Sequence, residues 1–429
     1  MMACNLKTTV ADWSGLPQEL VDSIAKQIAF LEDFIAFGLV CKSWRSAAAK
    51  ENFTSRLKHQ GPFLMLPQEH GAAMRKIYSF TDYKVRDLNL LEAEGKVCCS
   101  CSGWLITLQG LQFNLLHPLN RSQIKLPGFT DSSAKLSPVS MTDFHAIKKF
   151  VLSSNPAWTS DYTIMLLYDC KQLAFCKPRQ DRYWTSMDLG SHPVDITCYK
   201  GRFYAVSHNG RVSVFNIENP TKEAKTEVVV PRMPRELLVH ISPGRVKYLV
   251  ESAGDLLVVS AHEEGYEPAP KFRVFKVPLR DGNWQLDSEV KDLGNRTLFL
   301  GDNNTSFSVL ASDYSGCEPN CIYFFSYISQ QYTYSRQPHN YLLPSRENID
   351  IGIFHMKNGR IQEHFYWEQR RFPTFGTPCL WIQPKFLEGN SCFAPTTNKV
   401  TGSYRKKTKS NVLKPLGLVQ MAREDSFYF

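Results

Sequence analysis

The sequence predicts a mixed fold: a small all-α module near the N-terminus, followed by an all-β propeller of six or seven blades. Three observations support this prediction. Between residues 12 and 55, apolar side chains recur at three- and four-residue spacing, which is typical of helices. From residue 56 onward, short apolar runs alternate with glycine-containing turns, which is typical of strands. Similar patterns of turns and strands also repeat at intervals of about 50 residues, which is typical of propellers.

The first helix is predicted to begin at Leu16 and Pro17. Proline suits the first turn of a helix, because its φ is already helical and its missing N–H would have no partner there. The next apolar residues form one stripe, made of Leu20, Val21, Ile24 and Ile28. A module of this size cannot bury all of its apolar surface alone, so we expect a partner helix to cover part of it.

The order of residues in this segment resembles a known module. The elements are Leu16-Pro17, Glu19-Leu20, Ile24, Leu39-Val40-Cys41-Lys42 and Trp44-Arg45. They resemble the F-box, which docks a substrate receptor onto the Skp-class adaptor of a cullin–RING ubiquitin ligase. The resemblance implies that the adaptor-binding residues are Leu16, Pro17, Leu20, Val21, Ile24, Ile28, Leu39 and Val40. Trp44 is then expected to pack within the module, and Cys41 to be a small buried hydrophobe. The alternative is a helical cap that packs on the rest of its own chain.

The propeller prediction depends on a sequence pattern that repeats along the chain: a turn, a strand, a second turn and a second strand. Its clearest copies begin at Gly103, Gly201 and Gly254, which are 98 and 53 positions apart, or about two periods and one. Weaker copies lie at 162–175, 320–325 and 351–361. A single blade cannot bury its apolar side chains, whereas blades stacked around an axis can. A pair of β-sandwiches is the alternative architecture.

Several sequence segments in the C-terminal half, taken in their order, resemble those of a plant protein family. They lie at 292–303, 306–308, 316–324, 350–354 and 378–382. The set is similar to the large plant family of F-box proteins with a kelch-like β-propeller, long catalogued as a domain of unknown function. The resemblance implies a plant source and a substrate-receptor role. The chain lacks the paired glycines of true kelch repeats, so the word kelch describes the architecture only.

These patterns divide the 429 residues into four parts. We expect an N-terminal tail at 1–11, an F-box module at 12–55, a substrate-binding propeller at 56–382 and a basic flexible tail at 383–429. No apolar run of 18 residues occurs, and the first residues lack the apolar segment of a signal peptide, so we expect no membrane partner. Twelve scattered cysteines suggest reduced thiols in the cytosol or nucleus.

The charge of the chain is uneven. The net charge is +9, and eight basic against three acidic residues from position 384 onward place +5 of it in the tail. Arg405, Lys406, Lys407 and Lys409 are a candidate nuclear localisation signal, and a solvated flexible tail is the alternative. The pattern does not favour nucleic-acid binding. We therefore expect the protein in the nucleus, the cytoplasm or both.

The sequence predicts no catalytic, cofactor-binding or metal site. Asp292 belongs to a segment rich in turn-forming residues, with no calcium-loop spacing. Cys98 and Cys99 are adjacent in a predicted strand, so they face opposite sides and cannot share one ion. Cys317 and Cys321 lack a second cysteine pair to complete a zinc site. Phosphate-binding loops and hydrolase motifs are also missing from the sequence.

The predicted function is that of a non-catalytic substrate receptor in an SCF-type (Skp–cullin–F-box) ubiquitin ligase. The F-box would bind the adaptor, and loops on one face of the propeller would bind an unidentified protein target. Trp158 lies in one such loop and is a candidate interface anchor. Two alternatives remain: a propeller scaffold without a ligase role, and a propeller hydrolase with acidic or histidine side chains at the central channel.

Overall fold

The computed structural model describes most of the first 382 residues. The described residues are 13–28, 30–38, 40–48, 61–67, 74–88, 90–110, 112–118, 121–128, 147–168, 172–187, 192–217, 225–237, 247–263, 270–301, 306–325, 348–368 and 379–382. None of the helices within these ranges is long and apolar enough to cross a membrane.

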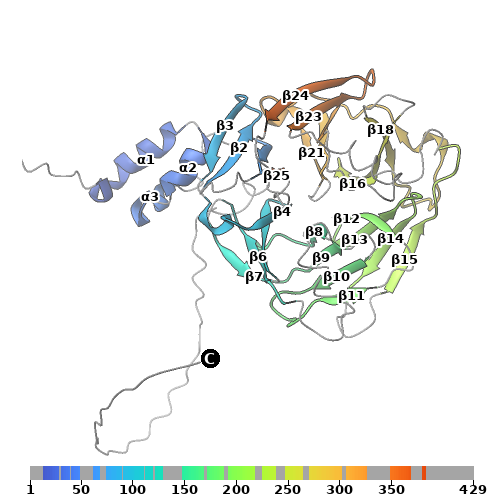
Figure 1. Ribbon diagram of the computed structural model, residues 1–429, viewed down its shortest axis with the longest axis horizontal. Helices are drawn as coiled ribbons and strands as arrows, with labels where there is room; N and C mark the ends of the chain where they lie inside the picture. Colours follow the sequence, from blue (N-terminus) through green and yellow to red (C-terminus); the bar gives the residue numbers. More distant parts are fainter. Residues whose placement is uncertain are drawn as a thin grey trace, which may run out of the picture. The chain divides into compact units, whose positions relative to one another are not determined.

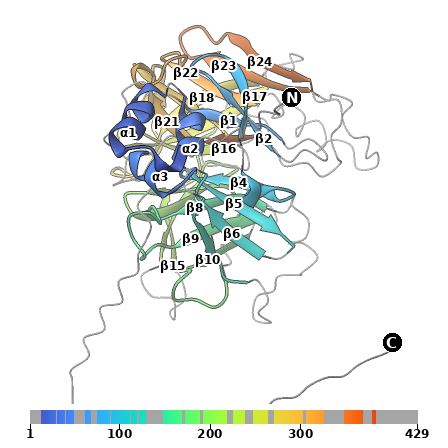
Figure 2. The same cartoon turned by 90° about the vertical axis from the view of Figure 1, so that its left-hand side faces the viewer.

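The N-terminal part is a module of short helices. It contains the 3-10 helix η1 (Trp13–Gly15) and the α-helices α1 (Gln18–Gln27), α2 (Leu31–Gly38) and α3 (Lys42–Ala47). Pro17 is the N-cap of α1, one residue before the first turn in which the sequence predicts it, because its ψ of 142° is extended; its carbonyl accepts hydrogen bonds from Leu20 and Val21. Helix α3 contacts both α1 and α2 (Figure 2).

The rest of the described chain forms six sheets arranged as the blades of a propeller (Figure 1), which confirms the predicted fold class and sets the blade number at six. Blade 1 contains β25 (Leu380–Ile382), β1 (Phe63–Met65), β2 (Arg75–Ser79) and β3 (Lys84–Leu88). Blade 2 contains β4 (Val97–Cys101), β5 (Trp104–Gln109), β6 (Gln112–Leu116) and β7 (Gln123–Lys125). Blade 3 contains β8 (Ile147–Leu152), β9 (Ile164–Tyr168), β10 (Gln172–Cys176) and β11 (Thr185–Met187).

The second half of the ring follows the same order along the chain. Blade 4 contains β12 (Pro193–Tyr199), β13 (Arg202–Ser207), β14 (Val212–Asn216) and β15 (Lys225–Val230). Blade 5 contains β16 (Lys247–Ser252), β17 (Asp255–Glu263), β18 (Pro270–Lys276) and β19 (Glu289–Val290). Blade 6 contains β21 (Phe307–Leu310), β20 (Arg296–Phe299), β22 (Cys321–Phe325), β23 (Asn348–His355) and β24 (Ile361–Glu368). Its strands β20 and β22 are parallel, whereas the other neighbours are antiparallel.

The innermost strands surround the propeller axis. Contacts between blades run from β25 to β4, β8, β12, β16 and β21 in turn (Figure 1). Strand β25 comes from the C-terminal end of the propeller and pairs antiparallel with β1, where Leu64 lies opposite Trp381. The first blade is therefore built from both ends of the propeller sequence, and this pairing closes the ring.

The repeated glycines lie in the turns that join the first two strands of three blades. Gly103, Gly201 and Gly254 have φ values of 85°, 75° and 79°. Each follows a residue that also has positive φ. Two consecutive residues with positive φ are typical of the tight hairpin turn that matches the twist of its strands. Glycine is therefore required at the second of these positions, which explains why the glycine-containing turn repeats along the sequence.

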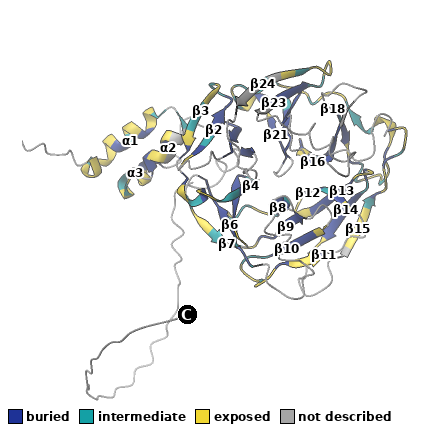
Figure 3. Ribbon diagram, viewed as in Figure 1, coloured by how far each residue is buried: buried dark blue, intermediate teal, exposed yellow. Residues whose placement is uncertain are grey.

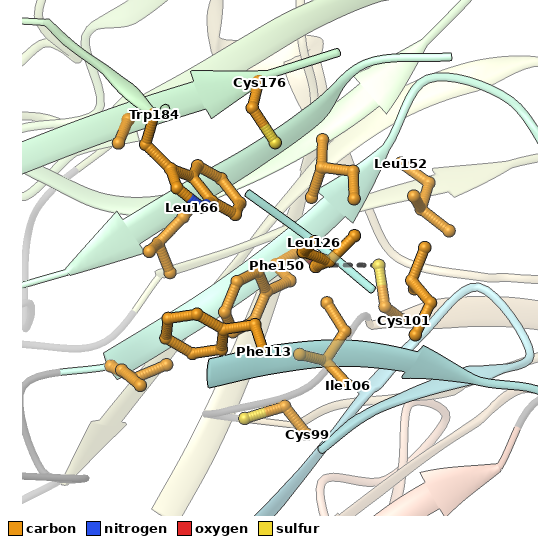
Figure 4. Close-up of a cluster of buried hydrophobic side chains, with 14 of the residues drawn as sticks. Cys99, Cys101, Ile106, Phe113, Leu126, Phe150, Leu152, Leu166, Cys176 and Trp184 are labelled. Carbon is orange, nitrogen blue, oxygen red and sulfur yellow. Dashed lines mark hydrogen bonds between the residues drawn. The ribbon is translucent and has the colours of Figure 1, made fainter. Parts of the chain in front are cut away.

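The core of the propeller lies between the blades. The described residues form six buried apolar clusters, and each fills the space between two neighbouring blades. Between blades 2 and 3, the rings of Phe113, Phe150 and Trp184 pack together (Figure 4). Cys98 faces the preceding cluster, whereas Cys99 faces this one, as the alternation of the strand predicts. Stacking therefore buries both faces of each blade.

The cluster between blades 1 and 2 also contains residues of the helical module. Phe34 and Phe37 of α2 are buried in the same cluster as Ile77 of β2 and Leu88 of β3. The guanidinium of Arg86 lies 4.0 Å from the ring centre of Phe30, a cation–π distance. Part of the apolar surface of the module is thus covered by its own chain.

Candidate functional site

One row of apolar side chains on α1 remains exposed. Leu20 is 52% exposed and Ile24 is 37% exposed, and they lie one helical turn apart. Figure 3 shows exposed positions along α1. Val40, just before α3, is 55% exposed. Large apolar side chains that stay exposed on a small module favour a protein-docking surface.

The other predicted adaptor-binding residues have different environments. Val21 is buried, although it lies in the same apolar stripe of the sequence. Leu16 and Ile28 are half-buried and pack against the cluster that contains Val21. Pro17 is exposed, and Leu39 lies outside the described residues. The exposed candidates from the predicted set are therefore Pro17, Leu20, Ile24 and Val40, to which we refer as the docking face.

Trp44 packs inside the module. Its ring centre is 4.6 Å from that of Phe37, and its Nε1 donates a hydrogen bond of 3.1 Å to the carbonyl of Trp13. This contact joins α3 to both α2 and η1, as the sequence predicts for Trp44. Cys41 is half-buried at the start of α3 rather than fully buried. The helical-cap alternative applies to the Phe34 side of the module and not to the docking face.

A second candidate site lies at the axis of the propeller. A cavity of about 300 Å³ is lined by the innermost strands of blades 3, 4, 5 and 6. Its walls include Leu152, Thr197, Glu251, Ser308 and the turn residue Gly254. Contacts between the innermost strands of neighbouring blades bring these residues together, so the cavity follows from the closure of the ring.

Arg296 is the central polar residue of this axial cavity. Its Nε donates hydrogen bonds of 3.1 Å to Ser252 Oγ and 3.0 Å to Ser308 Oγ. The two hydroxyl oxygens are 2.9 Å apart. The side chains of blades 5 and 6 are thereby held in one network, with the guanidinium fixed at the cavity wall.

The charged lining of the axial cavity consists of Glu251, Arg296 and Asp313. The lining of the cavity therefore contains charges of both signs. The network of Arg296 with Ser252 and Ser308 was not predictable from the sequence, because its residues lie on separate strands and have no recognisable spacing. The only local signal is Gly254, which marks a turn and not a ligand.

Trp158 is displayed by an ordered loop between β8 and β9. Its side chain is 57% exposed. Asn155 holds this loop, since its Oδ1 accepts hydrogen bonds of 2.9 Å from both Trp104 Nε1 and the backbone of Ala157. The Trp158 backbone N–H donates to the carbonyl of Asn155. An exposed tryptophan on a loop with this many internal bonds has the character of an interface anchor.

The other candidate residues from the sequence have structural environments or lie outside the described part of the chain. Asp292 Oδ1 accepts a hydrogen bond of 2.8 Å from the backbone of Gly294, which is an ordinary turn contact. Burial raises the pKa of Cys99 strongly and that of Cys317 to about 12, so both thiols are protonated at neutral pH. The basic residues Arg405, Lys406, Lys407 and Lys409 lie outside the described residues.

The geometry defines a class of protein: a six-bladed propeller that carries a helical docking module with an exposed apolar face. Comparison with protein families agrees with this description. An F-box domain model matches residues 13–56, and a KIB1-4 beta-propeller model matches residues 77–355. The chain therefore belongs to the KIB1-4 beta-propeller family, with an F-box domain at its N-terminus.

Relatives in Arabidopsis thaliana are described as F-box proteins and match this chain over most of their length. The F-box protein SKIP23 is 27% identical over 406 residues, covering 82% of this chain and 91% of the relative. The F-box protein At2g17036 is 23% identical over 398 residues, covering 82% of this chain and 90% of the relative. The chain is thus similar to plant F-box proteins over nearly their whole length, as the sequence analysis predicts.

Proposed function

We propose that this protein is the substrate-recognition subunit of an SCF-type ubiquitin ligase. The F-box would bind a Skp-class adaptor, and through it a cullin–RING ligase. The propeller would bind a protein target. The observation that carries this proposal is the exposed pair Leu20 and Ile24 within the segment that matches the F-box model.

Adaptor binding is consistent with the energetics of the docking face. Full burial of a leucine or isoleucine side chain contributes about 1.5–3 kcal/mol. Leu20 and Ile24 are already partly covered, so each would supply a portion of this amount on docking. The Phe34 side of the module is buried in the cluster with the first blades, so docking would not require the module to leave the propeller.

The proposed mechanism is proximity. The receptor would hold the target beside a ubiquitin-charged enzyme, which raises the effective concentration of target lysines. The ligation chemistry would belong to other subunits, so the chain itself needs no catalytic residue. The axial cavity around Arg296 and the exposed Trp158 are the surfaces that favour target binding. We also propose that the protein acts in the nucleus, the cytoplasm or both, on the basis of the basic tail.

A charge substitution on the docking face tests the proposal. In the variant Leu20→Lys/Ile24→Lys, two charges would have to be buried against the adaptor, so we expect co-purification with a Skp-class adaptor to be lost. By the usual relation of free energy to affinity, loss of about 1.4 kcal/mol already weakens binding tenfold. The measurement is a pull-down of the full chain with purified adaptor, followed by determination of the dissociation constant.

The control is Leu286→Lys, which places one lysine on a leucine that is 74% exposed in the propeller, and the single variant Leu20→Lys matches it in charge. This control should bind the adaptor like the unmodified protein. Circular dichroism and thermal unfolding should show that all of these variants fold. Equal adaptor binding by the docking-face variant and the control would contradict the proposal and favour a scaffold without a ligase role.

A further inference from the structure

Three side chains with metal-binding atoms converge at one end of blade 6. They are Glu318, Cys321 and His355, whose ligand atoms all lie within 4.8 Å of one another. Cys321 begins β22, and His355 ends β23. Neither the proposed adaptor contact nor the axial cavity uses these residues.

The strand register brings the thiol and the imidazole together. Cys321 and His355 are direct partners in the antiparallel pair of β22 and β23. Side chains of directly opposed residues lie on the same face of a sheet. The distance from Cys321 Sγ to His355 Nδ1 is 3.3 Å, and from His355 Nδ1 to Glu318 Oε2 it is 3.9 Å.

The outer nitrogen of the imidazole also has a partner. Nε2 of His355 lies 3.2 Å from Oε1 of Gln362, a residue on β24. With the proton on Nε2, the imidazole donates to this amide oxygen, and the lone pair of Nδ1 is available on the side of Cys321. An imidazole that binds a metal usually has this kind of second contact, which fixes its orientation and tautomer.

The backbone around Glu318 is held in place. Its N–H donates a hydrogen bond of 3.2 Å to Tyr323 Oη, and its carbonyl accepts one from Thr297 Oγ1. The N–H of Asn320 donates to the carbonyl of Arg296, and the carbonyl of Asn320 accepts from Met356. The segment that supplies the carboxylate and the thiol is therefore fixed to β20, to β22 and to the residue that follows β23.

We infer that Glu318, Cys321 and His355 form a zinc-binding site. Sulfur, imidazole nitrogen and carboxylate oxygen are the protein ligands of zinc, and donors around one tetrahedral zinc are about 3.5 Å apart. The measured Sγ–Nδ1 distance agrees with this spacing. Glu318 is half-exposed, so its carboxylate can rotate toward the other two ligands. As the zinc–sulfur bond forms, the thiol releases its proton to solvent.

The ligand set implies an open coordination position. Three protein ligands leave one tetrahedral position for water, and His355 and Glu318 both reach the surface. Zinc bound here would join the start of β22 to the end of β23. This inference is independent of the proposed ligase role, because the site lies in blade 6 and outside the docking face.

Metal titration of the full chain tests the inference. After treatment with a chelator, the protein should bind one equivalent of zinc and raise its unfolding temperature. Cobalt in place of zinc should produce a thiolate-to-cobalt absorption band. In Cys321→Ser this band should disappear. In Gln362→Met, which removes only the second contact of His355, metal affinity should fall by about 10- to 100-fold.

The matched control is Cys317→Ser, which removes a nearby thiol outside the group of three ligands. This control should retain the cobalt band and the zinc stoichiometry. No cobalt band in the unmodified protein, or an equal loss of the band in both serine variants, would overturn the inference. If Cys321→Ser does not fold, unchanged metal affinity in both His355→Gln and Gln362→Met overturns it. Adaptor pull-down should be the same with and without zinc.

Discussion

The carboxylate of Glu289 is paired with two basic residues of blade 5. Arg273 donates to it through Nε and a terminal nitrogen, at 2.8 and 2.9 Å, and Lys291 Nζ lies 2.7 Å away. The hydrogen bonds from Arg273, together with the contribution of Lys291, lower the pKa of Glu289 to about 2 from its ordinary value of 4.5. Burial by itself would raise the pKa of Glu289, but the contacts with Arg273 and Lys291 outweigh this effect, so the folded state favours the charged form.

This pKa difference predicts an acid-dependent loss of stability. Because the pKa is lower in the folded state, the stabilisation is present above the unfolded value of 4.5 and is lost as the pH falls toward about 2. Glu289→Gln should lower the free energy of unfolding by about 1–3 kcal/mol at neutral pH. The difference from the unmodified protein should shrink on acidification, as measured by urea unfolding across the pH range. The exposed Glu227→Gln should show neither effect, and a pH-independent difference for Glu289→Gln would contradict the prediction.

Two neighbouring residues of α1 show that a helical period in the sequence does not predict which apolar side chains are buried. Leu20 and Val21 both fit the apolar stripe of α1, yet Leu20 is exposed and Val21 is buried. Adjacent residues on a helix differ by about 100° in direction, so a wide stripe contains both. The period of the apolar residues predicts the helix, but only the packing of α1 against its neighbours decides which side of the apolar stripe remains exposed to solvent.

The innermost strands are joined by a buried charge pair. Lys149 on β8 donates a hydrogen bond of 2.6 Å to Asp195 on β12, and both side chains are buried. The other carboxylate oxygen accepts from the backbone of Leu249 on β16, at 2.7 Å. Burial raises the pKa of Asp195, and the charge of Lys149 opposes this effect. One carboxylate therefore connects three neighbouring blades.

Removal of one member of this pair should be costly. Asp195→Ala leaves the ammonium of Lys149 buried without its partner, so we expect a loss of about 3–5 kcal/mol in the free energy of unfolding. The double variant Lys149→Met/Asp195→Leu removes both charges and should recover part of this loss. Urea unfolding of Lys149→Met, Asp195→Leu and the double variant forms a double-mutant cycle. Additive losses in that cycle would show that the pair does not couple the strands.

At the scale of the whole propeller, stability depends on the pairing of β25 with β1. Trp381 is buried in β25, its Nε1 donates a hydrogen bond of 2.8 Å to the carbonyl of Leu300, and its ring lies 5.0 Å from that of Phe299. These contacts join the last strand to blade 6, while the ladder with β1 joins it to blade 1. A ring of blades leaves no large apolar face open only if this strand is present.

Two truncations test the closure. A chain that ends after residue 382 keeps β25, whereas a chain that ends after residue 378 lacks it. We expect the longer chain to unfold in one cooperative transition. The shorter chain should lose this cooperativity and expose apolar surface, because the clusters on both sides of blade 1 lose one wall. Differential scanning calorimetry and binding of a hydrophobic dye measure these effects. Equal transitions for the two chains would show that the ring does not need β25.

Local patterns in the amino-acid sequence are sufficient to predict several features of this protein. The period of apolar residues, the glycine-containing turns and the alternation in Cys98-Cys99 depend on a few neighbouring residues, so the helices, the blades and the opposite faces of the two cysteines were predictable. Tertiary structure alone decided the number of blades, the axial cavity and the group formed by Glu318, Cys321 and His355. Cys321 and His355 are far apart along the chain, and Arg296 meets Ser252 from another blade. Such contacts depend on strand register and ring closure, which no local pattern encodes.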